Sequence, residues 1–374
     1  MAKTPPKSKS ENGTIKKQEF DLTNFKSNTG FSSTVKDKEL VMIPLGEAFT
    51  EVTNCGIAKG YVNLFRGFTN TGKSTGIYQG IVSCQKMGLL PVIIDTEGNF
   101  SWEYAKSIGV EFTEVLDDNG DVVNYEGFFI FMNSDLLEQK YGKWDYDEGG
   151  EKKNSRGEAC IEDIPNFIDN LLEMQSKDEI PYEFCFFWDS IGSIDCFKAV
   201  KSKSRNNMWN ANALEVSFKA ILNAKIPNSR KEGKKYTNTF VAVQKIWYDG
   251  MNNVVRGKGG EAFNYSARII YHFGGIVSHG TKILKAELEG KSYSFGIETK
   301  LGCIKNQVTG ITLSGLIVSL AQGYWAADKI DVYKKQYKSF LLEKLGLDKS
   351  TSSKLDITIK KEDVVESNDM FGED

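Results

Sequence analysis

Short apolar runs alternate with amphipathic stretches over the middle of the chain, and this alternation predicts strands separated by helices. Residues 61–66 have the two-residue alternation of a strand, residues 74–86 have helical periodicity, and residues 89–95 form an almost fully apolar run. A strand, a loop, a helix and a second strand in this order predict a βαβ unit. The alternation continues with predicted helices at 163–175 and 208–224 and with buried strands at 184–189 and 238–244. We therefore expect an α/β fold with a mostly parallel central sheet flanked by helices.

The pattern is weaker in the last third of the chain. Apolar alternation there predicts strands at 267–273, 282–289 and 298–306, and helices around 314–322 and 332–345. The predicted core covers residues 41–330 and carries a charged, aperiodic surface insertion at about 139–158. After the core, the pattern and composition of residues 331–374 predict a short helix and an acidic tail that is disordered from Lys361 onward.

The first forty residues differ from the core in composition. Residues 1–40 are rich in Lys, Ser, Thr and Asn, and they carry the isolated apolar side chains Phe20, Leu22, Phe25 and Phe31. This composition predicts a flexible basic arm that docks on a neighbouring protomer through a few anchors.

Composition excludes several classes of protein. The 374 residues are 40% hydrophobic and 26% charged, which is typical of a globular chain. Six Cys without a C-x-x-C pair and only two His favour neither a zinc site nor a disulfide framework. With no long apolar stretch and no signal-like start, we expect a cytoplasmic protein without a membrane partner. The formal net charge of −3 combines a basic start with an acidic end, so a nucleic acid would have to bind local basic segments.

The segment GFTNTGKS at residues 67–74 fits the pattern G-x-x-x-x-G-K-[ST], and it lies between a predicted strand and a predicted helix. This context disfavours the alternative of a chance glycine-rich turn. In such a phosphate loop, backbone N–H groups converge on phosphate, the Lys73 ammonium reaches the β- and γ-phosphate oxygens, and the Ser74 hydroxyl coordinates Mg²⁺. We expect ATP and Mg²⁺ as cofactors, with ATP held by Gly67, Phe68, Thr69, Asn70, Thr71, Gly72, Lys73, Ser74 and Thr75.

Carboxylates stand at the carboxyl ends of two predicted strands, where α/β proteins bind ligands. Asp189 ends the run FCFFWD and is the candidate second metal ligand, with a helix cap as the alternative. In the segment IIDTEG, Asp95 and Glu97 follow the strand after the phosphate-loop helix. Glu97 is the candidate general base for an attacking water, and a helix cap is again the alternative.

These motifs together resemble the RecA-type strand-exchange recombinases, most closely the phage UvsX-like group. The resemblance covers about residues 40–325 and rests on the phosphate loop, IIDTEG, FFWDS, VAVQK and RGKGGEAFNYSA in this order. It implies a RecA-like P-loop ATPase core, in the host cytoplasm if the protein is phage-encoded. It also implies site residues: Glu97 activates water, Tyr104 stacks on adenine, Gln244 senses the γ-phosphate, and Lys305 reaches the ATP of the neighbouring protomer. The chain departs from the family pattern at Val243, at Gln307 and in the insertion.

Two segments after core strands combine cations with apolar or aromatic side chains, as a polyanion site requires. Taken alone, either charge run is more often a solvated surface. Their positions after the strands that carry Asp189 and Gln244, together with the resemblance, favour single-stranded DNA binding. The candidate residues are Lys198, Lys201, Lys203, Arg205, Met208, Lys245, Trp247, Arg256, Lys258, Gly259 and Gly260.

The function that the sequence predicts is that of a DNA-dependent ATPase that forms filaments on single-stranded DNA, pairs it with homologous duplex DNA and exchanges strands. A single-strand-binding or mediator protein is a further expected partner. Two alternatives remain open: a hexameric helicase core on the same ATPase fold, and a regulatory RecA-like ATPase with no DNA role. A protomer that binds its neighbour through one heterologous surface forms a ring or a helix, depending on whether the rotation closes.

Overall fold

The computed structural model describes residues 21–29, 36–142, 157–203, 207–249, 254–275, 280–288, 291–329, five positions between 332 and 342, and 360–363. The chain divides into two units, 1–37 and 38–374. In the first unit the arm includes a helix, α1 (Leu22–Thr29), which the sequence pattern did not predict. Phe25 is exposed on α1, whereas Phe20, Phe31 and the side chain of Leu22 lie outside the described residues.

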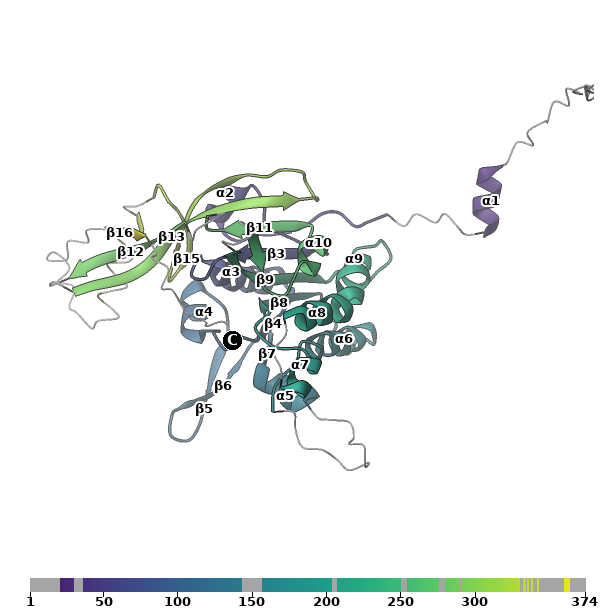
Figure 1. Cartoon of the computed structure of the whole chain (residues 1–374), viewed down its shortest axis with the longest axis horizontal. Helices are drawn as coiled ribbons and strands as arrows, with labels where there is room; N and C mark the ends of the chain where they lie inside the picture. The colour runs from purple at the N-terminus through teal and green to yellow at the C-terminus, as the bar shows by residue number, and fades with distance from the viewer. Residues whose placement is uncertain are drawn as a thin grey trace, which may run out of the picture. The chain divides into compact units, whose positions relative to one another are not determined.

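Six neighbouring strands of the second unit form a parallel sheet (Figure 1); the apolar runs predict five of them, and the strand at 130–133 is an addition. In spatial order they are β11 (Ile269–Phe273), β3 (Val62–Gly67), β9 (Thr239–Asp249), β8 (Phe184–Ile191), β4 (Leu90–Asp95) and β7 (Ile130–Asn133). Both faces of this sheet are buried, which explains why its strands have almost no polar alternation.

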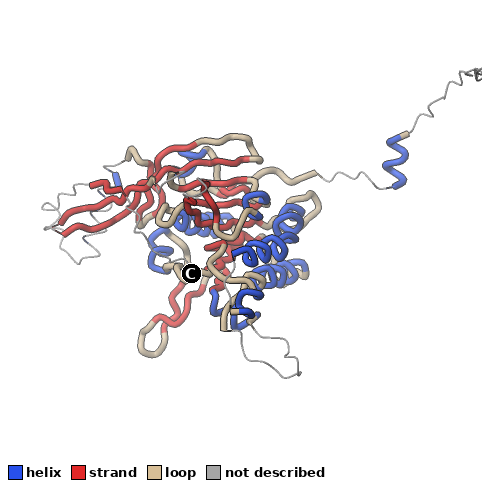
Figure 2. Tube along the Cα trace, in the orientation of Figure 1, coloured by secondary structure: helices blue, strands red, loops and turns tan. Residues whose placement is uncertain are grey.

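Side chains of β8 divide between two hydrophobic clusters. Phe186 and Trp188 pack in one cluster with α6 (Asp163–Ser176) and α8 (Asn207–Ala220), and Cys185 and Phe187 pack in the other with α3 (Lys73–Met87). In Figure 2, α6 and α8 lie together beside the parallel strands. The predicted helices at 74–86, 163–175 and 208–224 are therefore confirmed, although the last one ends in a π-helical turn, η1 (Ile221–Lys225).

Beyond β11 the sheet is antiparallel, so the prediction of a mostly parallel sheet holds only for the six strands above. The 12-stranded sheet continues through β13 (Lys291–Asn306), β14 (Ser314–Leu320) and β15 (Gly323–Ala326), and β12 (Thr281–Leu288) also pairs with β13. The predicted helix at 314–322 is wrong, because β14 pairs with β13 along its whole length. Ile317 and Val318 of β14 pack in different clusters, on opposite faces of the sheet.

The predicted disorder of the tail is wrong for its first residues. Lys360–Asp363 forms β16, an edge strand that pairs antiparallel with β12, and the rest of the tail lies outside the described residues. Of the predicted helix at 332–345, the five described positions are helical, and Tyr333 packs against Leu284 and Phe295. The predicted insertion begins within a helix, α5 (Ser134–Tyr141), and its residues 143–156 also lie outside the described residues.

The remaining elements are short. They are β1 (Met42–Ile43), α2 (Glu47–Thr53), β2 (Ile57–Ala58), α4 (Trp102–Ile108), β5 (Thr113–Leu116), β6 (Val122–Glu126), α7 (Phe197–Ser202), α9 (Ile226–Ser229), β10 (Val254–Gly257) and α10 (Ala262–Ser266). Within the described ranges, none of the helices combines the length and apolar character that crossing a bilayer requires.

Candidate functional site

The predicted phosphate loop joins the end of β3 to the first turn of α3. Gly67 lies so close to a neighbouring strand that a Cβ there would come within 2.2 Å of the Phe273 carbonyl oxygen. Gly72 has φ 90° and precedes Lys73, the first residue of the 15-residue helix. The segment therefore places the unpaired N–H groups of a helix N-terminus at the carboxyl edge of the parallel strands, a geometry that favours anions.

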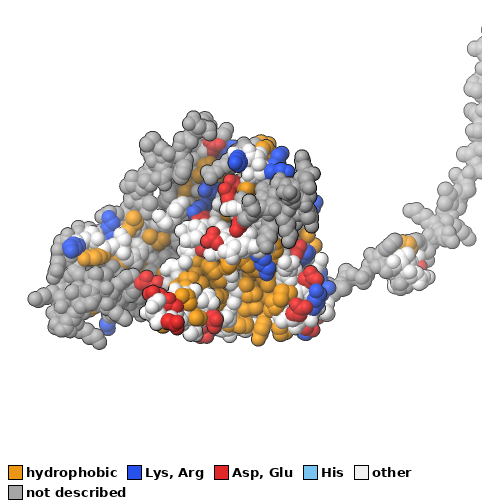
Figure 3. Space-filling model, turned by 90° about the horizontal axis from the view of Figure 1, so that it is seen from below, with side chains coloured by type: hydrophobic (Ala, Val, Ile, Leu, Met, Phe, Trp, Pro, Cys, Tyr) orange, Lys and Arg blue, Asp and Glu red, His pale blue; other side chains and the backbone are white. Residues whose placement is uncertain are grey.

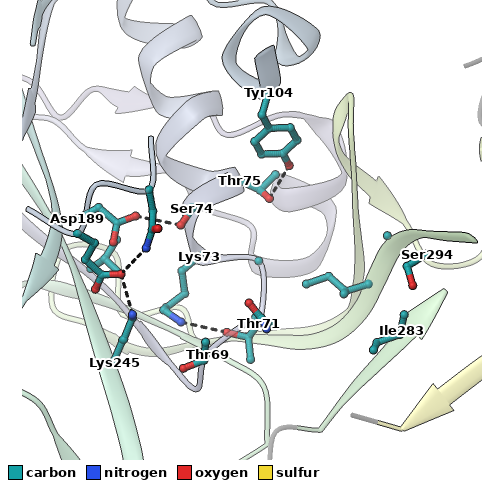
Figure 4. A pocket seen from close by; sticks show the side chains of 17 residues that line it. Thr69, Thr71, Lys73, Ser74, Thr75, Tyr104, Asp189, Lys245, Ile283 and Ser294 are labelled. Atoms are coloured by element: carbon teal, nitrogen blue, oxygen red, sulfur yellow. Dashed lines mark hydrogen bonds and ion pairs between the residues drawn. The ribbon is translucent and has the colours of Figure 1, made fainter. Parts of the chain in front are cut away.

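A pocket of about 620 Å³ opens beside this loop (Figure 4). It gathers most of the residues predicted to bind or hydrolyse the nucleotide, namely Thr69, Asn70, Thr71, Gly72, Lys73, Ser74, Thr75, Glu97, Tyr104 and Asp189. Its other lining residues are Asn99, Val243, Lys245, Ile283, Ser294, Gly296 and Ile297. Gly67 and Phe68 are buried and are not among the lining residues.

Lys73, Ser74 and Asp189 lie at the polar end of the pocket. The Lys73 ammonium donates to the Phe68 carbonyl and to Thr71 Oγ1 at 3.4 Å. Burial lowers the pKa of Lys73 to about 8, although Asp189 opposes the shift. Ser74 Oγ donates to Asp189 Oδ2 at 2.9 Å, and burial, reinforced by Glu97, raises the pKa of Asp189 to about 6. A hydroxyl beside a carboxylate provides the hard oxygen ligands that Mg²⁺ prefers, so these residues fit the predicted metal.

Glu97 is held in the same pocket by three donors. Its Oε2 accepts from Lys245 Nζ at 2.7 Å and from Asn99 Nδ2 at 3.1 Å, and its Oε1 accepts from the Ser190 hydroxyl. Burial alone would raise the pKa of Glu97, but the hydrogen bonds from Lys245 and Ser190 outweigh it and lower the pKa. Glu97 is therefore a carboxylate that faces the space next to Asp189.

The turn that carries Glu97 is organised by Asp95, whose positioning role the sequence analysis missed. Buried Asp95 accepts four backbone N–H groups at 3.0 to 3.3 Å, from Glu97, Gly98, Asn99 and Phe100. The signal was present, because Asp followed closely by Gly and Asn after a strand is typical of a side-chain-capped turn.

We expect Asp95→Ala to lower the free energy of unfolding by about 1–3 kcal/mol, because it leaves partly buried N–H groups without an acceptor. Asp117→Ala is the matched control: exposed Asp117 also accepts backbone N–H groups, from Asn119 and Asp121, but water can replace it there. Chemical denaturation measures the free energy of unfolding of both variants. Equal losses of stability would show that Asp95 does not organise the turn.

Tyr104 lies at the other end of the pocket, away from Asp189 (Figure 4). Its hydroxyl bonds to Thr75 Oγ1 at 2.8 Å and donates to the Leu320 carbonyl at 3.0 Å. These bonds fix the position of the ring, and Ile283 and Ile297 add apolar side chains to the pocket lining. The pocket therefore has a charged end at Asp189 and a more apolar, aromatic end at Tyr104.

The structure does not bring Gln244 and Lys305 into this pocket. Gln244 is fully buried, and its Nε2 donates to the carbonyls of Lys258 and Gly260 at 3.0 and 2.9 Å. Because side chains alternate along β9, its neighbours Val243 and Lys245 face the pocket instead. Lys305 Nζ donates to the Asn264 and Tyr265 carbonyls at 2.8 and 3.2 Å, and its predicted role in a neighbouring protomer stays a prediction.

In the first predicted DNA segment, residues 198–209, the part before the undescribed residues 204–206 is mostly helical. Lys198 and Lys201 lie on α7, and Lys203 ends that helix with φ 52°. The Lys198 ammonium lies 4.2 Å from the centre of the Trp209 ring, and Met208 is 79% exposed. Arg205 lies outside the described residues.

The second predicted DNA segment is an antiparallel ribbon in which β10 pairs back on β9. Arg256 lies opposite Trp247, and its Nε donates to Asp249 Oδ2 at 2.9 Å. Gly259 packs so closely on β8 that a Cβ would come within 2.4 Å of an Ile191 side-chain carbon, so the glycine serves packing there. Of the other predicted DNA contacts, Lys258 and Gly260 follow the ribbon, whereas Lys245 lines the pocket and pairs with Glu97.

The comparisons with known proteins find a partial similarity. No family model matches the chain. Protein RecA from two strains of Ureaplasma parvum serovar 3 is 33% identical over 93 residues, which is 24% of this chain and 28% of each RecA. The chain therefore aligns with little more than a quarter of the length of these relatives. The structure defines a mixed α/β protein with a large central sheet, and the alignment relates a part of it to RecA.

Proposed function

We propose that the protein is a RecA-like P-loop ATPase that binds single-stranded DNA, forms filaments on it and promotes homologous pairing and strand exchange. The observation that carries the proposal is the pocket in which Lys73, the Ser74–Asp189 pair and Glu97 meet beside a helix N-terminus. The partial similarity to RecA supports the recombinase class within the broader group of ATPases.

The pocket residues that the sequence predicts have distinct roles in ATP hydrolysis. The N–H groups of residues 69–74 bind phosphate, and Lys73 exchanges its bond to the Phe68 carbonyl for the β- and γ-phosphate oxygens. Ser74 and Asp189 hold Mg²⁺, which when bound neutralises charge on the β- and γ-phosphates. Glu97 orients the attacking water and accepts its proton. Tyr104 and the apolar end of the pocket receive the adenine.

The DNA surface consists of α7 and the β9–β10 ribbon. The helix α7 follows β8, and the ribbon is formed by the last residues of β9 with β10; both β8 and β9 also carry pocket residues. Lys198, Lys201, Lys203, Arg256 and Lys258 bind phosphates, and exposed Met208 and Trp247 contact bases. Gln244 donates to the carbonyls of Lys258 and Gly260 and so connects the segment that follows β10 to β9.

Self-assembly is supported by exposed apolar side chains at the end of the sheet where β5, β6, β7 and α5 lie (Figure 1). These elements expose Leu116, Val122, Val123 and Leu136. Figure 3 looks at this end and shows hydrophobic side chains gathered over its centre, with the basic side chains scattered at the margin. Such a face suits a neighbouring protomer better than it suits a polyanion. Lys305, the arm and a mediator or single-strand-binding protein complete the proposed assembly in the cytoplasm.

We expect the triple variant Lys198→Gln, Lys201→Gln and Lys203→Gln to weaken single-stranded DNA binding irrespective of sequence. Each lost phosphate contact reduces the slope of log affinity against log salt by about 0.7, so three contacts reduce it by about 2. The matched control replaces Lys106, Lys177 and Lys235, which are exposed and paired with carboxylates elsewhere. A salt titration that gives the same slope for both triple variants would remove α7 from the DNA surface.

A strand-exchange assay tests the proposed function. Single-stranded DNA and a homologous linear duplex are mixed with the protein, Mg²⁺ and ATP, and heterologous duplex is the control. We expect exchange with the homologous duplex only. Duplex unwinding without homology would indicate a helicase, and ATP hydrolysis without any DNA affinity would indicate a regulatory ATPase.

A further inference from the structure

Lys245 is a cation in the pocket that the roles described so far do not use. It lies on the pocket-facing side of β9, and its Nζ is 2.7 Å from Glu97 Oε2 (Figure 4). The side chains of Lys245 and Glu97 are 28% and 12% exposed, so water screens this ion pair less than it screens a surface pair. Lys73 and Lys245 are the two cations among the residues that line the pocket.

The Glu97 carboxylate, which is proposed to accept a proton, is already engaged in the ion pair with Lys245. Both oxygens of Glu97 already accept hydrogen bonds, Oε1 from Ser190 and Oε2 from Lys245 and Asn99. A water that approaches Oε2 must compete with a charge-assisted bond, which is about twice as strong as a neutral one. In this arrangement Glu97 is positioned but not free to act as a base.

A nucleoside triphosphate would bring a competing anion into the same cavity. Lys73 already belongs to the phosphate loop, and Gln244 is turned to the opposite face of β9, so Lys245 is the polar side chain that β9 presents to the pocket. A lysine has three donors on a flexible four-carbon stem, so it can change partners without a backbone movement.

We propose that Lys245 exchanges Glu97 for the terminal phosphate of a bound nucleoside triphosphate, and that this exchange frees Glu97 to receive the proton of the attacking water. Lys245 thus recognises triphosphate and restrains the base until triphosphate is bound. A nucleoside diphosphate lacks the γ-phosphate, so it leaves the Lys245–Glu97 pair intact. The inference rests on the proposed ATPase function.

The first test compares the affinities of a non-hydrolysable ATP analogue and of ADP for the full-length Lys245→Met variant. Methionine keeps the length and removes the charge, so we expect affinity for the analogue to fall about 10- to 100-fold and affinity for ADP to change less than about threefold. Lys177→Met is the matched control, because Lys177 forms an ion pair of the same 2.7 Å length with Glu173 on α6, outside the pocket. A uniform loss for both nucleotides would reject the recognition role.

The second test uses Glu97→Gln, which removes the competing charge. If the two anions compete for Lys245, Glu97→Gln binds the triphosphate analogue more tightly than the wild type does, and adding Lys245→Met abolishes the gain. Unchanged triphosphate affinity in Glu97→Gln would overturn the exchange. The double variant leaves no buried charge unpaired at this position, so it also separates a binding defect from misfolding. Wild-type protein that binds neither nucleotide would reject the proposed ATPase function itself, whereas wild-type binding without these differences would reject only the role of Lys245.

Discussion

Replacing Lys73 with alanine is expected to lower ATP hydrolysis at least about 100-fold, to the level of the background. Lys73 is buried at the first turn of α3, where its ammonium lies against the loop that would hold phosphate. Lys73 is the cation of residues 67–74, and the other cation that lines the pocket, Lys245, comes from β9 and is paired with Glu97. Phosphate release measured with and without single-stranded DNA gives the result.

The matched control is Lys86→Ala, in the last turn of the same helix, where the side chain is exposed. We expect this variant to hydrolyse ATP at the wild-type rate. Comparison of the far-ultraviolet circular dichroism of both variants separates a loss of activity from a loss of fold. Wild-type turnover in Lys73→Ala would contradict the assignment of residues 67–74 as a phosphate loop.

Glu97→Gln is expected to reduce ATP hydrolysis by about 10²- to 10⁴-fold while nucleotide and DNA still bind. The amide keeps the shape of the side chain but cannot accept a proton, so the general-base contribution is lost. Glu173→Gln, an exposed carboxylate in an ion pair on α6, is the control and should leave hydrolysis unchanged. Single-turnover hydrolysis with bound nucleotide measures the chemical step directly. A normal rate in Glu97→Gln would leave Glu97 as a structural residue of the turn.

The sequence predicts the site residues that are contiguous in the chain or that follow an apolar run. Residues 67–74 are contiguous, so their pattern specifies both the turn and the helix start. Asp189 and Glu97 follow apolar runs, and the carboxyl ends of parallel strands meet at one edge of the sheet, so their proximity could be expected.

The side of β9 that faces the pocket could not be predicted in the same way. Residues 239–244 are all buried, because both faces of the sheet are covered, and the pattern therefore carries no alternation. The resemblance implies a γ-phosphate sensor at Gln244, and the charge pattern predicts a DNA contact at Lys245, whereas the structure places Lys245 in the pocket and Gln244 outside it. Only the packing of neighbouring strands decides which of the two adjacent side chains faces the cavity.

Long-range strand pairing explains the other errors. The sequence of β14 is as apolar as that of a buried helix, but its backbone groups are hydrogen-bonded to β13. The strand β16 pairs with β12, which lies about 75 residues earlier in the sequence. Local periodicity contains no information about such partners. The same holds for the ribbon of β9 and β10, which the sequence pattern presents only as a polar segment rich in Gly and Asn.

Electron microscopy of the protein with single-stranded DNA and a non-hydrolysable ATP analogue tests the proposed recombinase function most directly. We expect continuous helical filaments that require both DNA and the triphosphate, and that are absent with ADP or with Lys73→Ala. Closed rings, or particles that do not change with DNA and nucleotide, would contradict it.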